Sequence, residues 1–251
     1  MTPTKQGSSN SHLTGELTMI LTALHEHPAL ARALTDPSAP VDVRRKLIDG
    51  AFASLSPSAR ATLGDALDKN WDSSASLLNW VEETSVKAAW QSADSSGSIN
   101  RCLDEVFTFS QMVYHNHELR SALVDRSRSV DQRQALVRSL LAPTMAEPSV
   151  DIAVAALGSH YGTIDDALSA YLTIGAELIG AQIAVVKLAQ PLDSKQKKEL
   201  TAELAKRMGT TIIIQEVVDP SVLGGVRVEC GAEVIDSTLT SRLEAARREF
   251  S

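Results

Sequence analysis

The residues most suggestive of chemistry are a pair of glycines, Gly224 and Gly225, that follow a β-branched run. A glycine-bearing loop after a strand can bind phosphate through backbone amides, but it can also simply reverse the chain. A phosphate loop of the GxxxxGK[ST] type needs a lysine and a hydroxyl where a helix begins, and a dinucleotide fingerprint needs three spaced glycines. Neither pattern is present, and the strand-like VRVEC follows instead. We therefore interpret DPSVLGG as a turn that begins at Asp219 and Pro220.

The histidines, cysteines and serines of the chain also lack the spacing of a catalytic or metal site. His-x-His pairs occur at 25–27 and 115–117, but side chains at i and i+2 point to different sides of a helix. Cys102 and Cys230 lie far apart without a nearby ligand set, which favours reduced packing residues. No serine stands in G-x-S-x-G and no H-E-x-x-H occurs. We expect no catalytic residue, no cofactor and no metal.

Composition limits the possible partners. The chain of 251 residues carries 24 Lys and Arg against 31 Asp and Glu, and its net charge of −7 makes nucleic acid an unlikely partner. No uninterrupted apolar run approaches the roughly 18–20 residues of a membrane-spanning helix. The opening MTPTKQGSSNSH lacks the apolar core of a signal peptide. We expect a cytosolic protein that contacts a membrane only through partners.

The elements that would position any site begin with a repeated set of helices. Two segments, 89 positions apart, share the i, i+4, i+7, i+11 spacing of a one-faced helix. The apolar positions are Leu13, Leu17, Ile20 and Leu24 in the first segment and Cys102, Val106, Phe109 and Val113 in the second. The correspondence continues from 27–48 to 116–137 and, after a slip of one residue, from Trp71 to Tyr161. Residues 12–180 are therefore predicted to be a duplicated unit of about five short helices, a longer period than the ~34–47 residues of common helical arrays.

Two segments rich in small polar residues predict breaks in this helical pattern. QSADSSGS, residues 91–98, lies between the two copies and favours a flexible joint. TPTKQGSSNS, near the start, has a similar composition and predicts disorder over residues 1–11.

From Gln182 the pattern changes and predicts a small α/β module. QIAVVKLA predicts a strand, and DSKQKKELTAELAKRMG predicts a helix that ends at Gly209 and returns the chain to a parallel strand. TIIIQEVV, VRVEC and EVID predict three further strands, and STLTSRLEAARREF predicts an amphipathic closing helix. The expected fold class is mainly α with a small α/β C-terminal module: a duplicated short-helix bundle followed by a strand-helix-strand-strand-strand-helix domain.

The stretch VVDPSVLGGVRVECGAEVIDSTLTSRLEAARREF carries the most specific motif of the chain. With its Asp-Pro-x-x-x-Gly-Gly turn and its Val-Ile-Asp strand, it resembles the C-terminal signature of the δ subunit of bacterial F-type ATP synthases. The mitochondrial member of that family is the oligomycin-sensitivity-conferring protein. The matching positions are Asp219, Pro220, Leu223, Gly224, Gly225, Val234, Ile235, Asp236 and Leu243. VVKLAQPLDSKQKKELTAELAKRMG and NHELRSALVDRSRSVDQRQALV resemble the same family, so the match covers about residues 76–251.

The sequence departs from the family pattern in two places. LLNWVEETSVKAAW stands where the family's first helix opens with Tyr-Ala-x-Ala-Leu-Phe, and Ser-Thr replaces Gly-Ser after Val-Ile-Asp. The resemblance implies a six-helix bundle, expected over 76–180, and an α/β domain over 181–251. Residues 12–75 would then be a helical extension built from a partial extra copy, similar to the long δ subunits of actinobacteria.

The resemblance implies a non-catalytic subunit of the peripheral stalk, or stator, of the ATP synthase. The helical domain would bind N-terminal helices of the α subunits on the catalytic head. The C-terminal module would hold the C-terminus of the membrane-anchored b subunit, so that the chain resists rotor torque during proton-driven ATP synthesis. The protein would lie on the cytoplasmic face of the bacterial cell membrane, attached only indirectly through subunit b. Helix-in-groove binding at both ends would suit this role.

The family's groove between its first and fifth helices would run here between residues 77–90 and 149–160. Its candidate lining residues are Val81, Val86, Ile152 and Ala156. The same side chains suit an ordinary bundle core equally well. Two other functions stay open: a generic helical scaffold in another complex, which would not bind an α-subunit peptide, and a regulator that binds a nucleotide through the α/β module.

Overall fold

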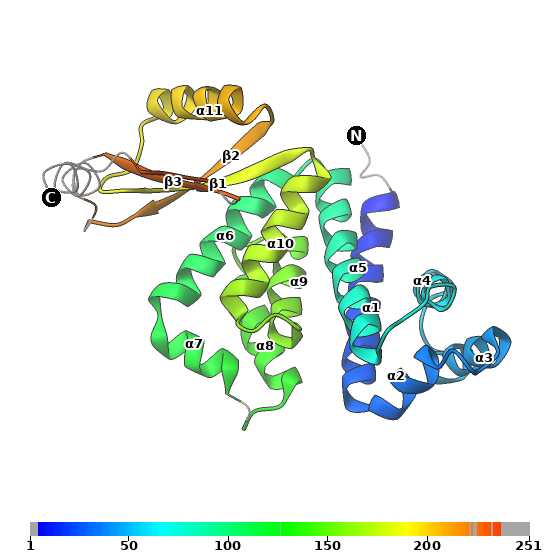
Figure 1. The fold of residues 1–251 in the computed structure, drawn as a ribbon. Helices are drawn as coiled ribbons and strands as arrows, with labels where there is room; N and C mark the ends of the chain where they lie inside the picture. Colours follow the sequence, from blue (N-terminus) through cyan, green and yellow to red (C-terminus); the bar gives the residue numbers. More distant parts are fainter. Residues whose placement is uncertain (1–4, 126, 221, 223–224, 232, 237–251) are drawn as a thin grey trace, which may run out of the picture. The chain divides into compact units, whose positions relative to one another are not determined.

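The chain divides into two compact units, Met1–Ile174 and Gly175–Ser251. The computed structural model describes residues 5–125, 127–220, 222, 225–231 and 233–236, with side chains from His12 onward. Unit 1 is built of helices, and unit 2 holds a four-stranded sheet with a helix on one face (Figure 1). The expected fold class, mainly α with a small α/β module, is confirmed.

Short turns join the described helices of unit 1 into a duplicated series. They are α1 (Lys5–Glu26), α2 (Pro28–Thr35), α3 (Val41–Ala51), α4 (Pro57–Leu67), α5 (Ser74–Ser95), α6 (Ile99–His115), α7 (His117–Val124), α8 (Val130–Leu141), α9 (Glu147–Ala155), the 3-10 helix η1 (Ala156–Gly158) and α10 (Ile164–Leu178), within which the division into units falls. α2 and α7 start 89 positions apart, and α5 and α10 start 90 apart. Helices α1–α5 therefore correspond in order to α6–α10, as the repeat predicts.

Equivalent hydrogen bonds support the duplication. Glu16 on α1 accepts hydrogen bonds from the backbone N–H of Ser56 (2.7 Å) and from its hydroxyl (2.5 Å), at the N-cap of α4. At the corresponding place in the second copy, Glu105 on α6 accepts from the N–H of Ala146 (2.8 Å), the N-cap residue of α9. A carboxylate placed at a helix N-terminus satisfies an otherwise unpaired N–H and complements the helix dipole. Each copy thus fixes its fourth helix to its first.

A second repeated contact joins the third helix of each copy to the second. Arg44 on α3 donates to the Leu34 carbonyl at 3.2 Å, and Arg133 on α8 donates to the Leu123 carbonyl at 3.1 Å. In both copies the arginine satisfies a carbonyl that the last turn of the shorter helix leaves without an intrahelical partner.

The segment 91–98, which the sequence predicts to be a flexible joint, is mostly helical, so that prediction was wrong. α5 continues to Ser95, and Ala93 on it is fully buried. The helix ends in a glycine C-cap: Gly97 has φ +69°, and the N–H of Ser98 donates to the Ala93 carbonyl at 2.8 Å. Burial of the apolar face of α5 outweighs the weak helix propensity of its serines, and the bend is confined to 96–98.

The two copies differ in how far their fourth helix is covered. α9 packs against α1, α5, α6 and α8, and all of its residues from Ser149 to Ala155 are buried. The corresponding α4 leaves Ala61 and Asp65 exposed, and the partly exposed Thr62 stands where α9 has the buried Ile152. Apolar residues thus occupy α9 where neighbouring helices cover it.

α1 begins at Lys5, inside the range 1–11 for which the sequence predicts disorder, and α5 begins at Ser74, beside the expected domain boundary at 75. Both helices lie in unit 1, where they pack along each other (Figure 1). The division of the helical part into a 12–75 extension and a 76–180 bundle stays a prediction.

The sheet of unit 2 has the expected strands. β1 (Ala181–Leu188), β2 (Thr211–Val218), β3 (Val226–Cys230) and β4 (Glu233–Asp236) lie in the order β2-β1-β3-β4. β1 pairs with β2 in parallel, as the strand-helix-strand pattern predicts, and the other pairs are antiparallel. The closing helix predicted from Ser237 lies outside the described residues.

Helix α11 (Ser194–Met208) packs against one face of this sheet. Leu204 lies in a cluster with buried residues of β1, β2 and β3, among them Val186, Ile214 and Val228. Asp193 and Gln196 form a capping box at the start of α11, and Gly209 with φ +68° ends it. The local signals at both ends of this helix therefore set its length.

Candidate functional site

The four candidate groove residues all lie inside unit 1. Val81 and Val86 are on α5, Ile152 is on α9 and Ala156 is in η1, and none is more than 5% exposed. α5 packs against α9, so the structure brings the two predicted sides of the groove together. Their burial fits both interpretations, and their role in binding a partner stays a prediction.

α1 covers part of this region. Val81 belongs to the same core cluster as Leu17 and Ile20 of α1. The hydroxyls of Thr18 and Ser85 lie 3.2 Å apart, and the Ser85 hydroxyl also contacts the Thr14 carbonyl at 3.2 Å. Small polar side chains at this crossing let the two helix backbones approach closely.

A buried carboxylate on α5 forms a polar cluster that the sequence analysis missed. Glu82 is 1% exposed and accepts hydrogen bonds from the Ser159 hydroxyl (2.6 Å), the His160 N–H (3.0 Å) and the Tyr171 hydroxyl. The Nδ1 atom of His160 lies 2.9 Å from the same carboxylate. Nearby, the indole N–H of Trp90 donates to the Tyr171 carbonyl at 2.8 Å. The cluster joins α5 to α10 and to the turn before it.

The electrostatics of this cluster suit a structural role. Burial and the adjacent Glu82 carboxylate raise the pKa of Tyr171 far above its ordinary value, so the phenol remains a hydrogen-bond donor. Glu82 lies on the buried face of α5, between Val81 and Val86, and this position is the only sequence signal that could have identified it. Because each carboxylate oxygen is hydrogen-bonded to donors of the same unit, the cluster joins two helices firmly.

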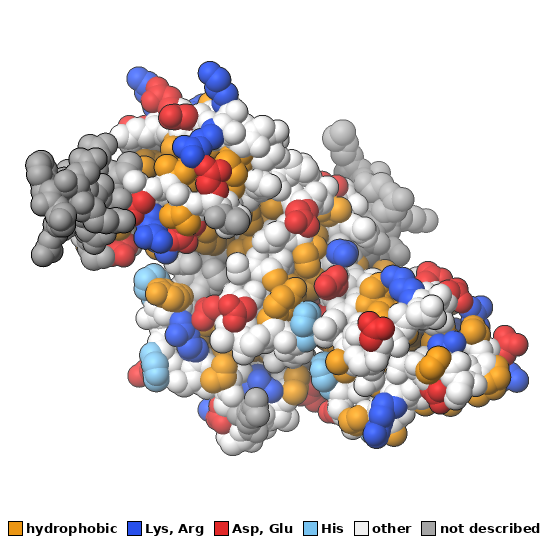
Figure 2. Space-filling view, in the orientation of Figure 1, with side chains coloured by type: hydrophobic (Ala, Val, Ile, Leu, Met, Phe, Trp, Pro, Cys, Tyr) orange, Lys and Arg blue, Asp and Glu red, His pale blue; other side chains and the backbone are white. Residues whose placement is uncertain are grey.

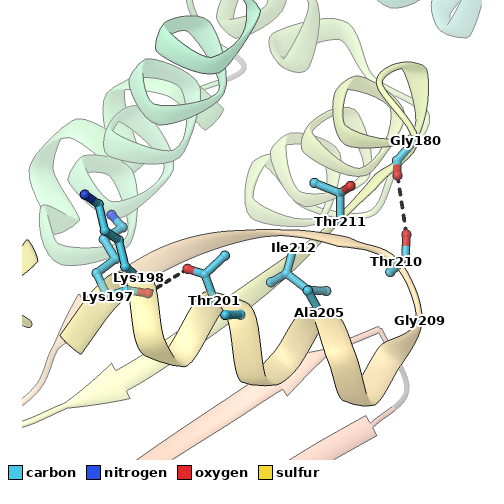
Figure 3. Close-up of a pocket in the computed structure, with 10 residues that line it drawn as sticks. Gly180, Lys197, Lys198, Thr201, Ala205, Gly209, Thr210, Thr211 and Ile212 are labelled. Carbon is cyan, nitrogen blue, oxygen red and sulfur yellow. Dashed lines mark hydrogen bonds between the residues drawn. The ribbon is translucent and has the colours of Figure 1, made fainter. Parts of the chain in front are cut away.

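Unit 2 carries an open groove along one side of α11 (Figure 3). Its volume is about 940 Å³. The lining residues are Gly180, Lys197, Lys198, Thr201, Ala202, Ala205, Gly209, Thr210, Thr211 and Ile212. Two lysines stand at one end, small side chains line the middle, and two glycines lie at the other end, where the Thr210 hydroxyl donates to the Gly180 carbonyl at 3.3 Å.

The charge of this groove contrasts with that of the whole chain. α11 carries five basic and two acidic side chains, whereas the chain as a whole has a net charge of −7. Basic side chains project from the surface over α11 with acidic ones among them (Figure 2). Lys197 is paired with Glu216 at 3.0 Å, whereas no ion pair joins Lys198 to any of the described residues. The lysine end of the groove suits an acidic group.

The motif turn lies partly in the described residues. The N–H of Asp219 donates to the Leu188 carbonyl at 2.9 Å, and Pro220 follows in a turn. Gly225 has φ +104°, a conformation that strongly favours glycine, and Asp236 ends β4. Leu223, Gly224 and Leu243 lie outside the described residues, so the structural role assigned to the whole motif stays a prediction.

The part of the chain that the structure describes lacks two features, a membrane-spanning helix and a metal-binding cluster. None of its helices combines the length and the apolar character needed to cross a membrane. Nor do three or more His, Cys, Asp or Glu side chains there gather in a way that could hold a metal ion.

Comparison with known proteins gives consistent results across both units. Residues 81–250 match the family model described as "ATP synthase delta (OSCP) subunit". An ATP synthase subunit delta from Nocardioides sp. is 35% identical over 95% of this chain and 87% of its own length. Its counterpart from Cutibacterium acnes is 32% identical over 96% of this chain and 92% of its own length.

Among solved structures, a chain of the mitochondrial ATP synthase hexamer of Toxoplasma gondii matches 67% of this chain and 96% of its own length. Its identity is 17% and its TM-score is 0.38, which is too low to support a comparison of folds. The family model extends from α5 to the C-terminal motif, and the two relatives match nearly the whole chain. The chain belongs to the ATP synthase delta (OSCP) subunit family.

Proposed function

We propose that this chain is a non-catalytic peripheral-stalk subunit that links the catalytic head of an F-type ATP synthase to the membrane-anchored b subunit. The observation that carries the proposal is the family match over residues 81–250, which spans both the helical unit and the α/β unit. A subunit of this kind catalyses nothing and works by binding a partner at each end. It lies on the cytoplasmic face of the cell membrane, attached through subunit b.

The helical unit is the part proposed to bind N-terminal helices of the α subunits. An amphipathic guest helix docks through its own apolar side chains at i, i+3, i+4 and i+7, which need exposed apolar side chains on the host as contacts. Unit 1 offers such contacts at exposed apolar residues, for example Val43 and Leu47, which lie four positions apart on α3. Unit 2 would bind a second subunit of the same complex. Because the two binding sites are linked in one chain, binding at one site raises the effective concentration at the other.

The groove along α11 is the proposed seat of the C-terminal segment of subunit b. Its small side chains at Thr201, Ala202 and Ala205 allow close approach of another backbone, and Lys197 and Lys198 favour acidic side chains on the partner. Complementary charge in a partly exposed groove speeds association and selects the partner, and it weakens as salt concentration rises.

Titration of the purified full-length chain with two labelled peptides tests the proposal. The peptides are the N-terminal segment of the α subunit and the C-terminal segment of the b subunit, and fluorescence anisotropy measures their dissociation constants. Both are expected to bind. If neither binds, the stalk proposal is wrong.

A paired charge reversal tests the location of the b-subunit site. The variant Lys197→Glu/Lys198→Glu is expected to weaken binding of the b peptide more than tenfold and to leave the α peptide unaffected. The matched control is Lys195→Glu/Lys206→Glu, which changes the same net charge on α11 outside the groove. Equal losses in both variants would show a general charge effect and argue against the groove.

A further inference from the structure

The α5–α9 region of unit 1 already holds a helix of the same chain. α1 contacts α5 along its length and also contacts α9, while α5 and α9 contact each other. α1 therefore lies over the seam between the two helices that would form the sides of the expected partner groove. The family resemblance predicts that α5 and α9 face each other, but the sequence pattern does not predict that α1 lies against both, since it shows only that α1 has a buried face.

The contact between α1 and α5 is that of a packed core. Leu17, Ile20 and Leu24 on α1 are each 0% exposed and share one cluster with Val81 and Leu77 of α5. A guest helix that entered the seam would have to return these side chains of α1 to water before it could bury its own. The net free energy of binding would be the difference between burying the apolar face of the guest and exposing the similar face of α1, and this difference is small.

Polar contacts fix the position of α1 on α5. The Thr18 and Ser85 hydroxyls are 3.2 Å apart, and Ser85 is 1% exposed. On the opposite side, Glu16 holds the N-terminus of α4 through two hydrogen bonds from Ser56. Displacement of α1 would leave these buried polar groups without hydrogen-bond partners. An apolar guest helix offers no replacement hydrogen bonds, so this free-energy cost would remain.

The connection to the rest of the chain adds to this advantage. α1 ends at Glu26 and α2 begins at Pro28, so a single residue joins them, and α2 itself packs against α5. This short tether keeps α1 at a high effective concentration beside its seat, whereas a partner helix must arrive from solution or from another subunit.

We propose that α1 acts as a resident guest helix: it permanently fills the seam between α5 and α9, so a partner helix binds unit 1 elsewhere. The proposal depends on the proposed function, because it concerns where the α-subunit helix docks. Residues 13–24 then take the place, within the same chain, that a bound partner helix would occupy.

A disulfide that locks α1 in place tests the proposal on the full-length chain. The variant Thr18→Cys/Ser85→Cys joins two adjacent side chains, while the native Cys102 and Cys230 are buried. The dissociation constant of the α-subunit peptide is expected to change less than twofold between the oxidised and the reduced form. The single variant Ser85→Cys serves as the control for oxidation.

A loss of affinity of tenfold or more on oxidation, restored by reductant, would overturn the proposal, because it would show that α1 must leave for the partner to bind. If neither form binds the peptide, the proposed function fails. Amide hydrogen exchange then tests the position of α1 independently of peptide binding. The amides of residues 13–24 are expected to be as protected from exchange as those of α5. Exchange of α1 more than a hundredfold faster than α5 would show that α1 is not resident.

Discussion

Removal of the Glu82 carboxylate tests whether the buried polar cluster stabilises unit 1. In Glu82→Leu the Ser159 hydroxyl, the His160 N–H and the Tyr171 hydroxyl lose their common acceptor inside the helical unit. A buried donor left without an acceptor costs about 1–3 kcal/mol, so the loss of an acceptor that three donors share is expected to cost about 3 kcal/mol or more. Tyr171→Phe removes a single donor to the carboxylate and is expected to cost about 1.5–3 kcal/mol. The larger loss in the glutamate variant follows from the number of groups left unpaired.

Urea unfolding followed by tryptophan fluorescence measures both losses, because Trp71, Trp80 and Trp90 all lie in unit 1 and report on it alone. The double variant supplies the control: since Glu82 and Tyr171 contact each other, their effects should be non-additive by about 0.5–3 kcal/mol. An unchanged or higher free energy of unfolding in Glu82→Leu would refute the reasoning. It would show that apolar packing is worth more at this position than the charged hydrogen bonds.

Three further results are expected. Leu17→Ala, at a fully buried site on α1, should lower the free energy of unfolding of unit 1 by about 2–5 kcal/mol in the same urea assay, whereas a loosely attached α1 would give less than 1 kcal/mol. Burial raises the pKa of Glu105, but hydrogen bonds from Ser149 and Ala146 outweigh this effect and the pKa is lowered. Its stabilising effect is therefore present above the ordinary pKa of a glutamate and is lost as the pH falls through the lowered one. Circular dichroism should show a smaller loss of stability on acidification in Glu105→Gln, and an unchanged pH profile would contradict this reasoning. Gly209→Ala should lower the melting temperature of unit 2 through a cost of about 1 kcal/mol, because Gly209 ends α11 with φ +68°, and Ala202→Gly, within α11, is the control for helix propensity.

Local sequence patterns predicted the elements of this protein well wherever their period is short. β2 and β3 have the bounds that TIIIQEVV and VRVEC predict, because a β-branched run and an alternation of apolar and polar residues are both properties of neighbouring positions. The duplication was also visible, since the two copies repeat the same helical faces. Segment 91–98 was the exception: its serines favour a loop, but the buried face of α5, which includes Ala93, extends the helix to Ser95.

The partners of the buried polar groups could not be predicted in this way. Glu16, Glu82 and Glu105 resemble ordinary helix-surface glutamates in the sequence, yet each accepts hydrogen bonds from residues 40 or more positions away. Periodicity shows which face of a helix is buried, but not which other helix covers it, because that choice depends on how all the faces fit together at once.

The sequence by itself thus determined the fold class, the repeat and the family, since the Asp-Pro turn and the alternating strands are local and specific. Only the tertiary structure decided that α1 lies over the seam between α5 and α9 and that a row of small residues and lysines along α11 forms a groove. Both depend on contacts between segments distant in the chain, for which no spacing of residues along the sequence gives a signal.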